Sequence, residues 1–484
     1  MAASVTAAAR RRWPLLLLVA IAARALTFGD PLVHADEQFY FVVAKAMWHG
    51  QLPYLDIWDR KPIGLFLLYM PAAALPLPWG TLAYQGIALA CVVATAGLVA
   101  RFAVRAGWAK GATAAGIAYI LWLDLLNGSS GQSPVFYNLP VAAAAWLVAT
   151  RAGARGAGLA AMALVGIAIQ IKPTVVFEGA FLGVWLLLDA RRARRARAGT
   201  IAYAVALVGL ALLPTATAYA FYAVKGIGAL WWQANVVGTL TRLADPPSIQ
   251  LAHGASLLLV LSPLIAMAGA SRREPVDGDP RLRRFLWCWL GAVLGGVVVF
   301  GGWYDHYGLP VVAPAAACAA GFLGGRGRRH AALILAFAAL TGQVVLGINR
   351  ARHGDLGQLR ALFDAVGRGP GTLFVYSGPP LIYGETGRSA PTRYIFPSHL
   401  YLAREEGSIG VRQADETRRI LATRPATIVT APPYRTEEPH IRAIVEAALR
   451  RDYRLGTRLP LGRATVSVYR LRADAVAAPA PSAP

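Results

Sequence analysis

Cysteines and charged residues are both scarce in this 484-residue chain. The three cysteines, Cys91, Cys288 and Cys318, all lie within apolar runs, which excludes a disulfide framework. Only 15% of the residues are charged, 56% are hydrophobic, and the mean hydropathy is +0.47. This balance excludes an ordinary soluble fold, and the sequence therefore predicts a polytopic α-helical membrane protein.

Acidic residues are scarcer than basic ones, so 48 Lys and Arg against 25 Asp and Glu give a formal charge of +23. On a soluble domain this excess would indicate nucleic-acid binding. Here the basic residues gather between apolar runs, where they set topology and contact membrane lipids. We therefore expect no nucleic-acid partner.

About eleven apolar segments are candidates for transmembrane helices, each of which needs about 20 mostly apolar residues. They are 13–29, 81–100, 111–127, 135–150, 157–171, 174–189, 200–223, 251–270, 285–301, 307–324 and 330–348. The stretch 63–77 is short and interrupted by prolines, so we expect it at the outer surface of the membrane.

Basic clusters occupy every second connection between these segments, which is the pattern of the cytoplasmic side. The clusters are 10–12, 101–110, 151–155, 191–197, 272–284 and 326–329. We therefore expect a cytoplasmic N-terminus in a bacterial inner (plasma) membrane. The connections 30–80, 128–134, the tight turn at Lys172-Pro173, 224–250 and 302–306 would then face the periplasm or exterior.

The composition changes after residue 349, where long apolar runs stop. Strand-like runs at 372–376, 426–430 and 464–469 alternate with helical patterns at 356–366, 414–422 and 440–450. This pattern predicts a soluble periplasmic or extracellular α/β domain over 350–474. The Ala- and Pro-rich segment 475–484 is predicted to be a disordered tail.

Acidic residues concentrate in the first outer connection, 30–80, which therefore indicates a site. It contains Asp30, Asp36, Glu37, Asp56 and Asp59, and these are followed directly by Arg60 and Lys61.

The order of these residues resembles the GT-C superfamily of glycosyltransferases, especially its protein O-mannosyltransferase and lipid A aminoarabinose transferase branch. The matching features are the Asp36-Glu37 pair, Tyr40, Gly50 with Pro53-Tyr54, the Trp58-Asp59-Arg60-Lys61-Pro62 segment, and His306-Tyr307 with Pro310. The likeness covers about residues 10–330. It implies that residues 1–349, including outer loop 30–80, form a catalytic domain. Such an enzyme passes a sugar from a polyprenyl-phosphate carrier to a glycan, lipid or protein acceptor.

The resemblance implies that Asp36 is the general base, with Glu37 as the second choice, and that the pair could hold Mg²⁺ or Mn²⁺. A competing interpretation is that Asp36 only caps the helix that begins there. The connection 127–134 has no acidic residue where this branch tends to carry one, which leaves metal dependence open.

Five residues are candidates for binding the donor phosphate: Arg60, Lys61, Lys172, His306 and Tyr307. Lys61 could instead anchor the chain at lipid headgroups, and Lys172 could simply precede a helix-ending proline. The other cavity candidates are His34, Tyr40, Asp56, Asp59, Asp124 and Glu178. Asp124 and Glu178 fall within predicted spans, where a carboxylate needs a partner, a cavity or access to the surface. Glu178 could pair with Lys172.

Two other functions remain open from the sequence. The first is a transporter of lipid-linked sugars, which would carry charged residues along a path between both membrane faces. The second is a non-catalytic protein of envelope polysaccharide assembly. The clustering of candidates on the outer face favours the enzyme.

Overall fold

The computed structural model describes residues 2–151, 153–193, 196–274 and 277–474, with side chains from Arg12 onward. The predicted tail 475–484 lies outside these residues, as do Arg194 and Arg195 of the predicted basic clusters.

The chain folds into two compact units. Unit 1 comprises Met1–Phe28, Tyr84–Ala218 and Pro246–Gly347. Unit 2 comprises Gly29–Ala83, Tyr219–Asp245 and Ile348–Pro484. The first outer loop therefore belongs to the same unit as the C-terminal segment, a grouping that their sequence separation does not suggest. The predicted division into a catalytic domain, 1–349, and a soluble domain, 350–474, stays a prediction.

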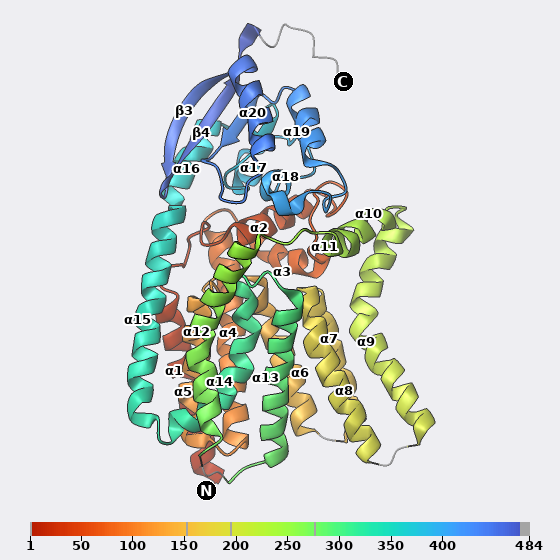
Figure 1. The fold of residues 1–484 in the computed structure, drawn as a ribbon, viewed down its shortest axis with the longest axis vertical. Helices are drawn as coiled ribbons and strands as arrows, with labels where there is room; N and C mark the ends of the chain where they lie inside the picture. The colour runs from red at the N-terminus through yellow and green to blue at the C-terminus, as the bar shows by residue number, and fades with distance from the viewer. Residues whose placement is uncertain (1, 152, 194–195, 275–276, 475–484) are drawn as a thin grey trace. The chain divides into compact units, whose positions relative to one another are not determined.

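All eleven apolar segments predicted as spans form helices, most of them within unit 1 (Figure 1). They are α1 (Ala2–Ala23), α4 (Trp79–Arg105), α5 (Ala112–Leu125), α6 (Ser133–Thr150), α7 (Arg155–Ile169), α8 (Val176–Arg192), α9 (Arg197–Val224), α12 (Pro247–Ser271), α13 (Pro280–Phe300), α14 (Leu309–Gly324) and α15 (Arg328–His353). In the part of the chain that the structure describes, eight helical segments are long and apolar enough to cross a membrane. The apolar part of α1 is the shorter stretch Arg12–Ala23, and α5 and α7 have only 14 and 15 residues. The chain is a multi-pass membrane protein.

Helix α14 is the buried centre of unit 1. Within its apolar window 83% of the residues are buried, whereas the corresponding value for α9 is 17%. Small residues allow this close packing. A Cβ added at Gly111 would lie 1.9 Å from the carbonyl oxygen of Ala320 in α14, so only glycine permits this approach.

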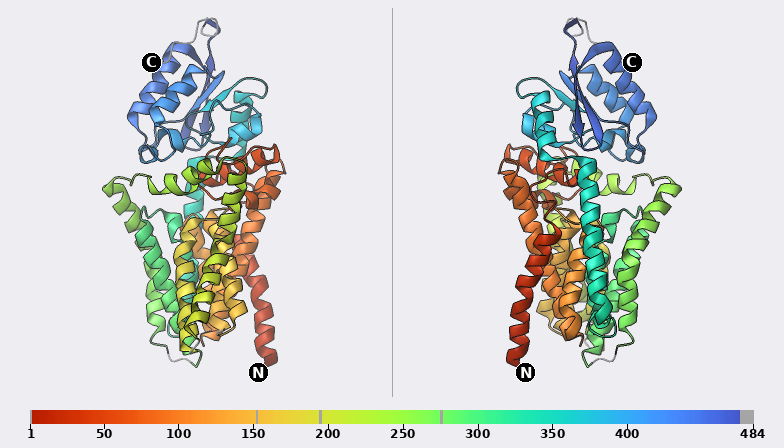
Figure 2. Two further views of the ribbon diagram at one scale, coloured as in Figure 1. Left: turned by 90° about the vertical axis from the view of Figure 1, so that its right-hand side faces the viewer. Right: turned by 90° about the vertical axis from the view of Figure 1, so that its left-hand side faces the viewer.

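Unit 2 contains a four-stranded sheet with the order β1-β2-β4-β3. Strands β1 (Leu373–Val375) and β2 (Thr427–Thr430) are parallel, and β3 (Tyr453–Leu461) and β4 (Ala464–Leu471) complete the sheet in antiparallel pairs. Figure 2 shows α19 (Gln413–Ala422) and α20 (Pro439–Asp452) side by side over one face. The predicted α/β architecture is confirmed, although β3 was not predicted. That strand is tolerated at the sheet edge despite Gly456 and Pro460, which weaken a strand pattern.

The remaining α-helices of unit 2 are short. They are α2 (Ala35–Trp48), α3 (Ile63–Ala73), α10 (Gly228–Trp232), α11 (Gly238–Leu240), α16 (Leu356–Val366), α17 (Leu381–Thr386) and α18 (Ser398–Tyr401). Two of them, α2 and α3, belong to the first outer loop. At 11 residues, α3 is too short to cross a bilayer, as predicted for 63–77.

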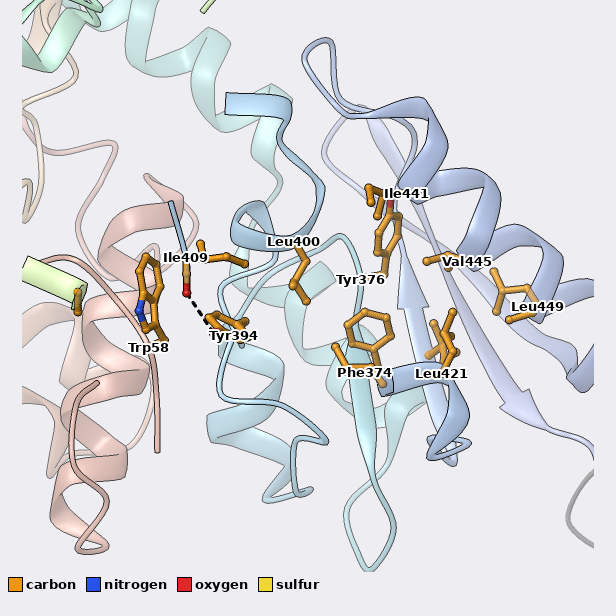
Figure 3. Close-up of a cluster of buried hydrophobic side chains, with 14 of the residues drawn as sticks. Trp58, Phe374, Tyr376, Tyr394, Leu400, Ile409, Leu421, Ile441, Val445 and Leu449 are labelled. Carbon is orange, nitrogen blue, oxygen red and sulfur yellow. Dashed lines mark hydrogen bonds between the residues drawn. The ribbon is translucent and has the colours of Figure 1, made fainter. Parts of the chain in front are cut away.

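One hydrophobic core joins the first outer loop to the C-terminal segment within unit 2 (Figure 3). Trp58 is buried in this core together with Tyr394, Leu400 and Ile409, and Phe374 of β1 belongs to the same cluster. The backbone N–H of Trp58 also donates to the carbonyl of Arg393 at 2.9 Å. Burial of an aromatic side chain of this size makes the loop an integral part of unit 2.

Candidate functional site

The two predicted catalytic carboxylates lie in the first turn of α2. His34 is the N-cap residue, and its Nδ1 accepts a hydrogen bond from the backbone N–H of Asp36 at 3.2 Å. Capping is therefore performed by His34, and the Asp36 carboxylate stays partly exposed, with 22% of its side chain accessible. Glu37 is fully buried. Of the two carboxylates, Asp36 is the one that a substrate can reach.

A tight turn before Trp58 positions the segment of the first outer loop that contains Lys61. The backbone N–H of Tyr54 donates to the carbonyl of Ile57 at 2.6 Å. The backbone N–H of Leu52 donates to the Asp56 carboxylate at 2.7 Å. Tyr54 is buried with φ of 72°, a left-handed conformation that is costly for a bulky residue. Its hydroxyl donates to the carbonyl of Lys61 at 2.8 Å. This hydrogen bond fixes the backbone of Lys61, while Asp56 stays at the exposed surface of the turn.

Asp59 lies close enough to Asp36 and Lys61 within unit 2 for their charges to affect its pKa. Burial raises the pKa of Asp59, Lys61 and Arg60 lower it in part, and the negative charge of Asp36 raises it again. The Lys61 ammonium lies 5.5 Å from the ring centroid of Tyr40, within the range of a cation–π contact. The structure thus brings together Asp36, Tyr40, Asp59 and Lys61, all of which were sequence candidates.

His399 from α18 lies beside Asp59 and was not predicted. Its Nε2 is 3.9 Å from Oδ1 of Asp59, and the ring packs against Phe39, Trp58 and Phe396 with centroid distances of 6.0, 4.7 and 5.2 Å. Burial lowers the pKa of His399 well below its ordinary value, and the positive charges of Arg60 and Lys61 lower it further. His399 is therefore neutral in the folded protein near pH 7.

We expect His399 to make stability depend on pH. Below about pH 6.5 the unfolded chain binds a proton at this histidine that the folded chain does not, so stability falls as the pH decreases. His399→Gln should reduce this loss, which amounts to at most about 1.4 kcal/mol per pH unit for one proton. The measurement is the thermal unfolding midpoint of the purified protein at pH 7.5 and 5.5. The matched control is His440→Gln at an exposed site of α20, and equal pH dependence in the wild type and both variants would contradict the account.

Glu405 binds three arginines inside unit 2, and none of these contacts was predicted. Arg60 donates two hydrogen bonds to its carboxylate, Arg242 donates from Nε at 2.9 Å, and Nε of Arg404 lies 3.6 Å away. Burial alone would raise the pKa of Glu405, but the charges of Arg60 and Arg242 outweigh burial and lower it. Because Arg60 is held by Glu405, Lys61 is the better candidate for binding a phosphate.

A separate small pocket lies in unit 1 and contains three other sequence candidates. It encloses about 40 Å³ and is lined by Lys172, Glu178 and Tyr307, with Phe177, Val297 and Phe300 among its apolar residues. The Lys172 ammonium lies 4.6 Å from the ring centroid of Tyr307, and the His306 ring packs against Tyr307 at 4.7 Å. The structure thus gathers Lys172, Glu178 and Tyr307 around an apolar cavity, and His306 lies beside Tyr307.

Asp124 has a partner that sequence analysis missed. Its Oδ1 lies 3.8 Å from Nη2 of Arg24, and both side chains are buried. The same Nη2 donates to the carbonyl of Gly128 at 3.2 Å. A carboxylate within the apolar part of the chain is stabilised by such a paired cation, so this contact explains Asp124 without a ligand.

The residues of α2 fit a divalent cation poorly. No three His, Cys, Asp or Glu side chains cluster as metal ligands anywhere in the described parts of the chain. Asp36 and Glu37 are adjacent on a helix, so their side chains point in different directions, and only Asp36 is accessible. The pair therefore does not supply a complete ligand set, and metal dependence stays a prediction.

Comparison with known proteins gives a likeness at the level of the fold. No protein-family model and no curated protein matches the sequence. The structure of ArnT from Cupriavidus metallidurans bound to undecaprenyl phosphate matches with a TM-score of 0.63 and 14% identity, over 94% of this chain and 97% of that chain. ArnT from the same organism in the apo state matches with a TM-score of 0.63 and 15% identity, over 97% and 98%. The chain has the fold of ArnT.

The ArnT likeness confirms the predicted fold class. The match extends over nearly the whole of both chains, so it includes the C-terminal segment as well as the membrane helices. At 14–15% identity it shows the fold alone, and the roles of individual residues depend on the geometry described above.

Proposed function

We propose that this protein is a glycosyltransferase that transfers a sugar from a polyprenyl-phosphate carrier to a glycan, lipid or protein acceptor. The observation that carries the proposal is the grouping of an accessible Asp36 with Tyr40, Asp59 and Lys61 in a chain with the ArnT fold. The ArnT structure itself contains undecaprenyl phosphate. With the N-terminus in the cytoplasm, the reaction would take place on the periplasmic face of a bacterial inner membrane.

The proposed reaction requires one base and one cation. Asp36 accepts the proton of an acceptor hydroxyl as the oxygen bonds to the anomeric carbon of the donor sugar. The bond from that carbon to the carrier phosphate breaks, and its electron pair stays on the phosphate oxygen. Lys61 stabilises the negative charge that develops there. Attack opposite the leaving phosphate inverts the anomeric carbon in one step.

The pocket of unit 1 suits the same donor chemically. Lys172 supplies a positive charge beside Tyr307 and His306, and Phe177, Val297 and Phe300 supply an apolar surface for an isoprenyl chain. Such a combination matches a lipid phosphate, which has an anionic head and an apolar tail. Lys172, His306 and Tyr307 are therefore a separate candidate set for binding the donor phosphate, argued within unit 1 alone.

The test of the proposal is release of free polyprenyl phosphate by the purified full chain. The protein is incubated with a panel of polyprenyl-phosphate sugars and a crude envelope extract as acceptor, with and without Mn²⁺. We expect release from one class of donor, which also identifies the sugar. No release from any donor by a folded protein would contradict the proposal and favour a transporter or a polysaccharide-assembly protein.

Lys61→Ala should weaken use of the donor. Loss of a cation that contacts the leaving phosphate should lower kcat/KM for the donor by about tenfold to a hundredfold, equivalent to roughly 1.4 to 2.7 kcal/mol. The measurement is release kinetics against donor concentration. Lys45→Ala is the matched control, because Lys45 lies on α2 and pairs with Glu385 at 2.7 Å. Equal kcat/KM for the wild type and Lys61→Ala would exclude Lys61 from the site.

A further inference from the structure

Unit 2 contains a concave site that the proposed reaction does not use. It is an open groove of about 480 Å³, lined by Asp56 of the first outer loop and by residues of the C-terminal segment. The polar side chains on its wall include Arg393, Glu416 and Arg419, and the buried Tyr394 also borders the groove. The volume is sufficient for a ligand of one or a few sugar rings.

The groove offers hydrogen-bond donors and acceptors without a net charge. Two carboxylates, Asp56 and Glu416, are balanced by two guanidinium groups, Arg393 and Arg419. Glu416 and Arg419 pair with each other at 2.6 Å, so their charges largely cancel. A strongly anionic ligand therefore gains little from this surface as a whole, whereas a neutral ligand with many hydroxyl groups can use both kinds of partner.

Arg393 and Asp56 have hydrogen-bonding groups that a ligand can use. One Nη of Arg393 donates to the hydroxyl of Tyr394 at 3.0 Å, and its guanidinium carbon lies 5.2 Å from that ring centroid. Within the described residues, Arg393 forms no ion pair, and a guanidinium has five N–H donors. Asp56 is exposed, and its Oδ2 accepts the backbone N–H of Leu52 at 2.7 Å. Sugar hydroxyls can accept from Arg393 and donate to Asp56.

The groove shares a wall with the candidate catalytic segment. Tyr394 on the groove side packs against Trp58, with ring centroids 5.8 Å apart. Trp58 also packs against His399, which lies beside Asp59. The peptide N–H of Trp58 donates to the carbonyl of Arg393, so the backbones of the two sites are joined directly. A ligand in the groove would contact the same loop that carries Asp59 and Lys61.

We propose that this groove binds a neutral glycan portion of the acceptor. The proposal rests on the proposed function, because it assigns a substrate class to that enzyme. Arg393 and Asp56 bind the hydroxyl groups of the glycan, and Tyr394 with Trp58 connects its position to the first outer loop. The groove contributes affinity for the acceptor and takes no part in proton transfer or in binding the donor phosphate.

The experiment measures binding of the purified full chain to an array of neutral and acidic glycans, which needs no turnover. We expect binding to neutral glycans and at least a fivefold lower signal for Arg393→Gln and for Asp56→Asn. The matched control is Arg418→Gln, since Arg418 is next to the groove residue Arg419 on α19 but pairs with Asp415 outside the groove. Its signal should equal that of the wild type. Thermal unfolding of each variant shows that the fold is retained, and Asp56→Asn keeps the test decisive if Arg393→Gln is unstable.

Three results would overturn the groove assignment: no glycan bound, binding only to acidic glycans, or neutral-glycan binding that both variants retain. Failure of the proposed function looks different. In that case the wild type releases no polyprenyl phosphate from any donor, whether or not it binds glycans on the array.

Discussion

Asp36→Asn is expected to lower the rate of sugar transfer by about 10² to 10⁴-fold, the usual contribution of a general base. Asparagine has nearly the same shape as aspartate but cannot take a proton from an acceptor hydroxyl. The backbone N–H of Asp36 would still donate to His34, so the start of α2 should be preserved. We therefore expect normal membrane insertion and a thermal unfolding midpoint close to that of the wild type.

The measurement is the initial rate of polyprenyl phosphate release at saturating donor, together with the amount of protein in the membrane fraction. Glu37→Gln separates the two carboxylates, because Glu37 is buried and should matter through folding instead of proton transfer. Asp415→Asn on the exposed surface of α19 is the matched control. If Asp36→Asn keeps half or more of the wild-type rate, Asp36 is not the base.

The second large effect is expected from Glu405→Gln, which removes the charge that three arginines share. The Glu405 side chain is 2% exposed, and Arg60, Arg242 and Arg404 surround it. Breaking a buried pair typically costs about 3 to 5 kcal/mol because the remaining charge is left without compensation. Arg60 belongs to the first outer loop and Arg242 to the connection 224–250, so the variant should loosen both segments within unit 2.

Thermal unfolding and limited proteolysis of the purified protein test this expectation. The midpoint should fall by several degrees, and cleavage should become faster in the first outer loop and around Arg242. Glu446→Gln is the matched control, because Glu446 is 48% exposed and its pair with Arg450 should contribute about 0 to 1 kcal/mol. Midpoints and cleavage rates that match between the two variants would show that Glu405 does not hold these segments.

Hydropathy predicted the membrane helices well because each is a long apolar run with a local signal. Helices α5 and α7, with 14 and 15 residues, are shorter than the about 20 residues that a span needs, although their positions agree with the prediction. Strand β3 was missed because Gly456 and Pro460 interrupt its pattern, and its pairing with β4 depends on tertiary context. A short edge strand gives little local information.

Within unit 2, the sequence indicated the part of the candidate site that lies in one loop. Asp36, Tyr40, Asp59 and Lys61 are close in sequence, and the loop was recognisable from its concentration of acids. His399 and Glu405 were missed because they follow in the C-terminal segment, where no local pattern connects them to Asp59 or Arg60. Only the fold of unit 2 places them in contact. The partner of Asp124 was missed for the same reason, since Arg24 lies in the predicted span 13–29, about 100 residues before Asp124, and no local pattern connects the two.

The proposal that the first outer loop binds the sugar carrier can be tested most directly by locating the phosphate. The measurement is a cryo-EM structure of the full chain with polyprenyl phosphate added. We predict density for the phosphate within about 4 Å of the Lys61 ammonium, the distance of an ion pair, on the side that Asp36 can reach. A phosphate bound away from Lys61, whether beside Lys172 or elsewhere, with the first outer loop free of ligand, would contradict the claim that Lys61 binds the leaving phosphate.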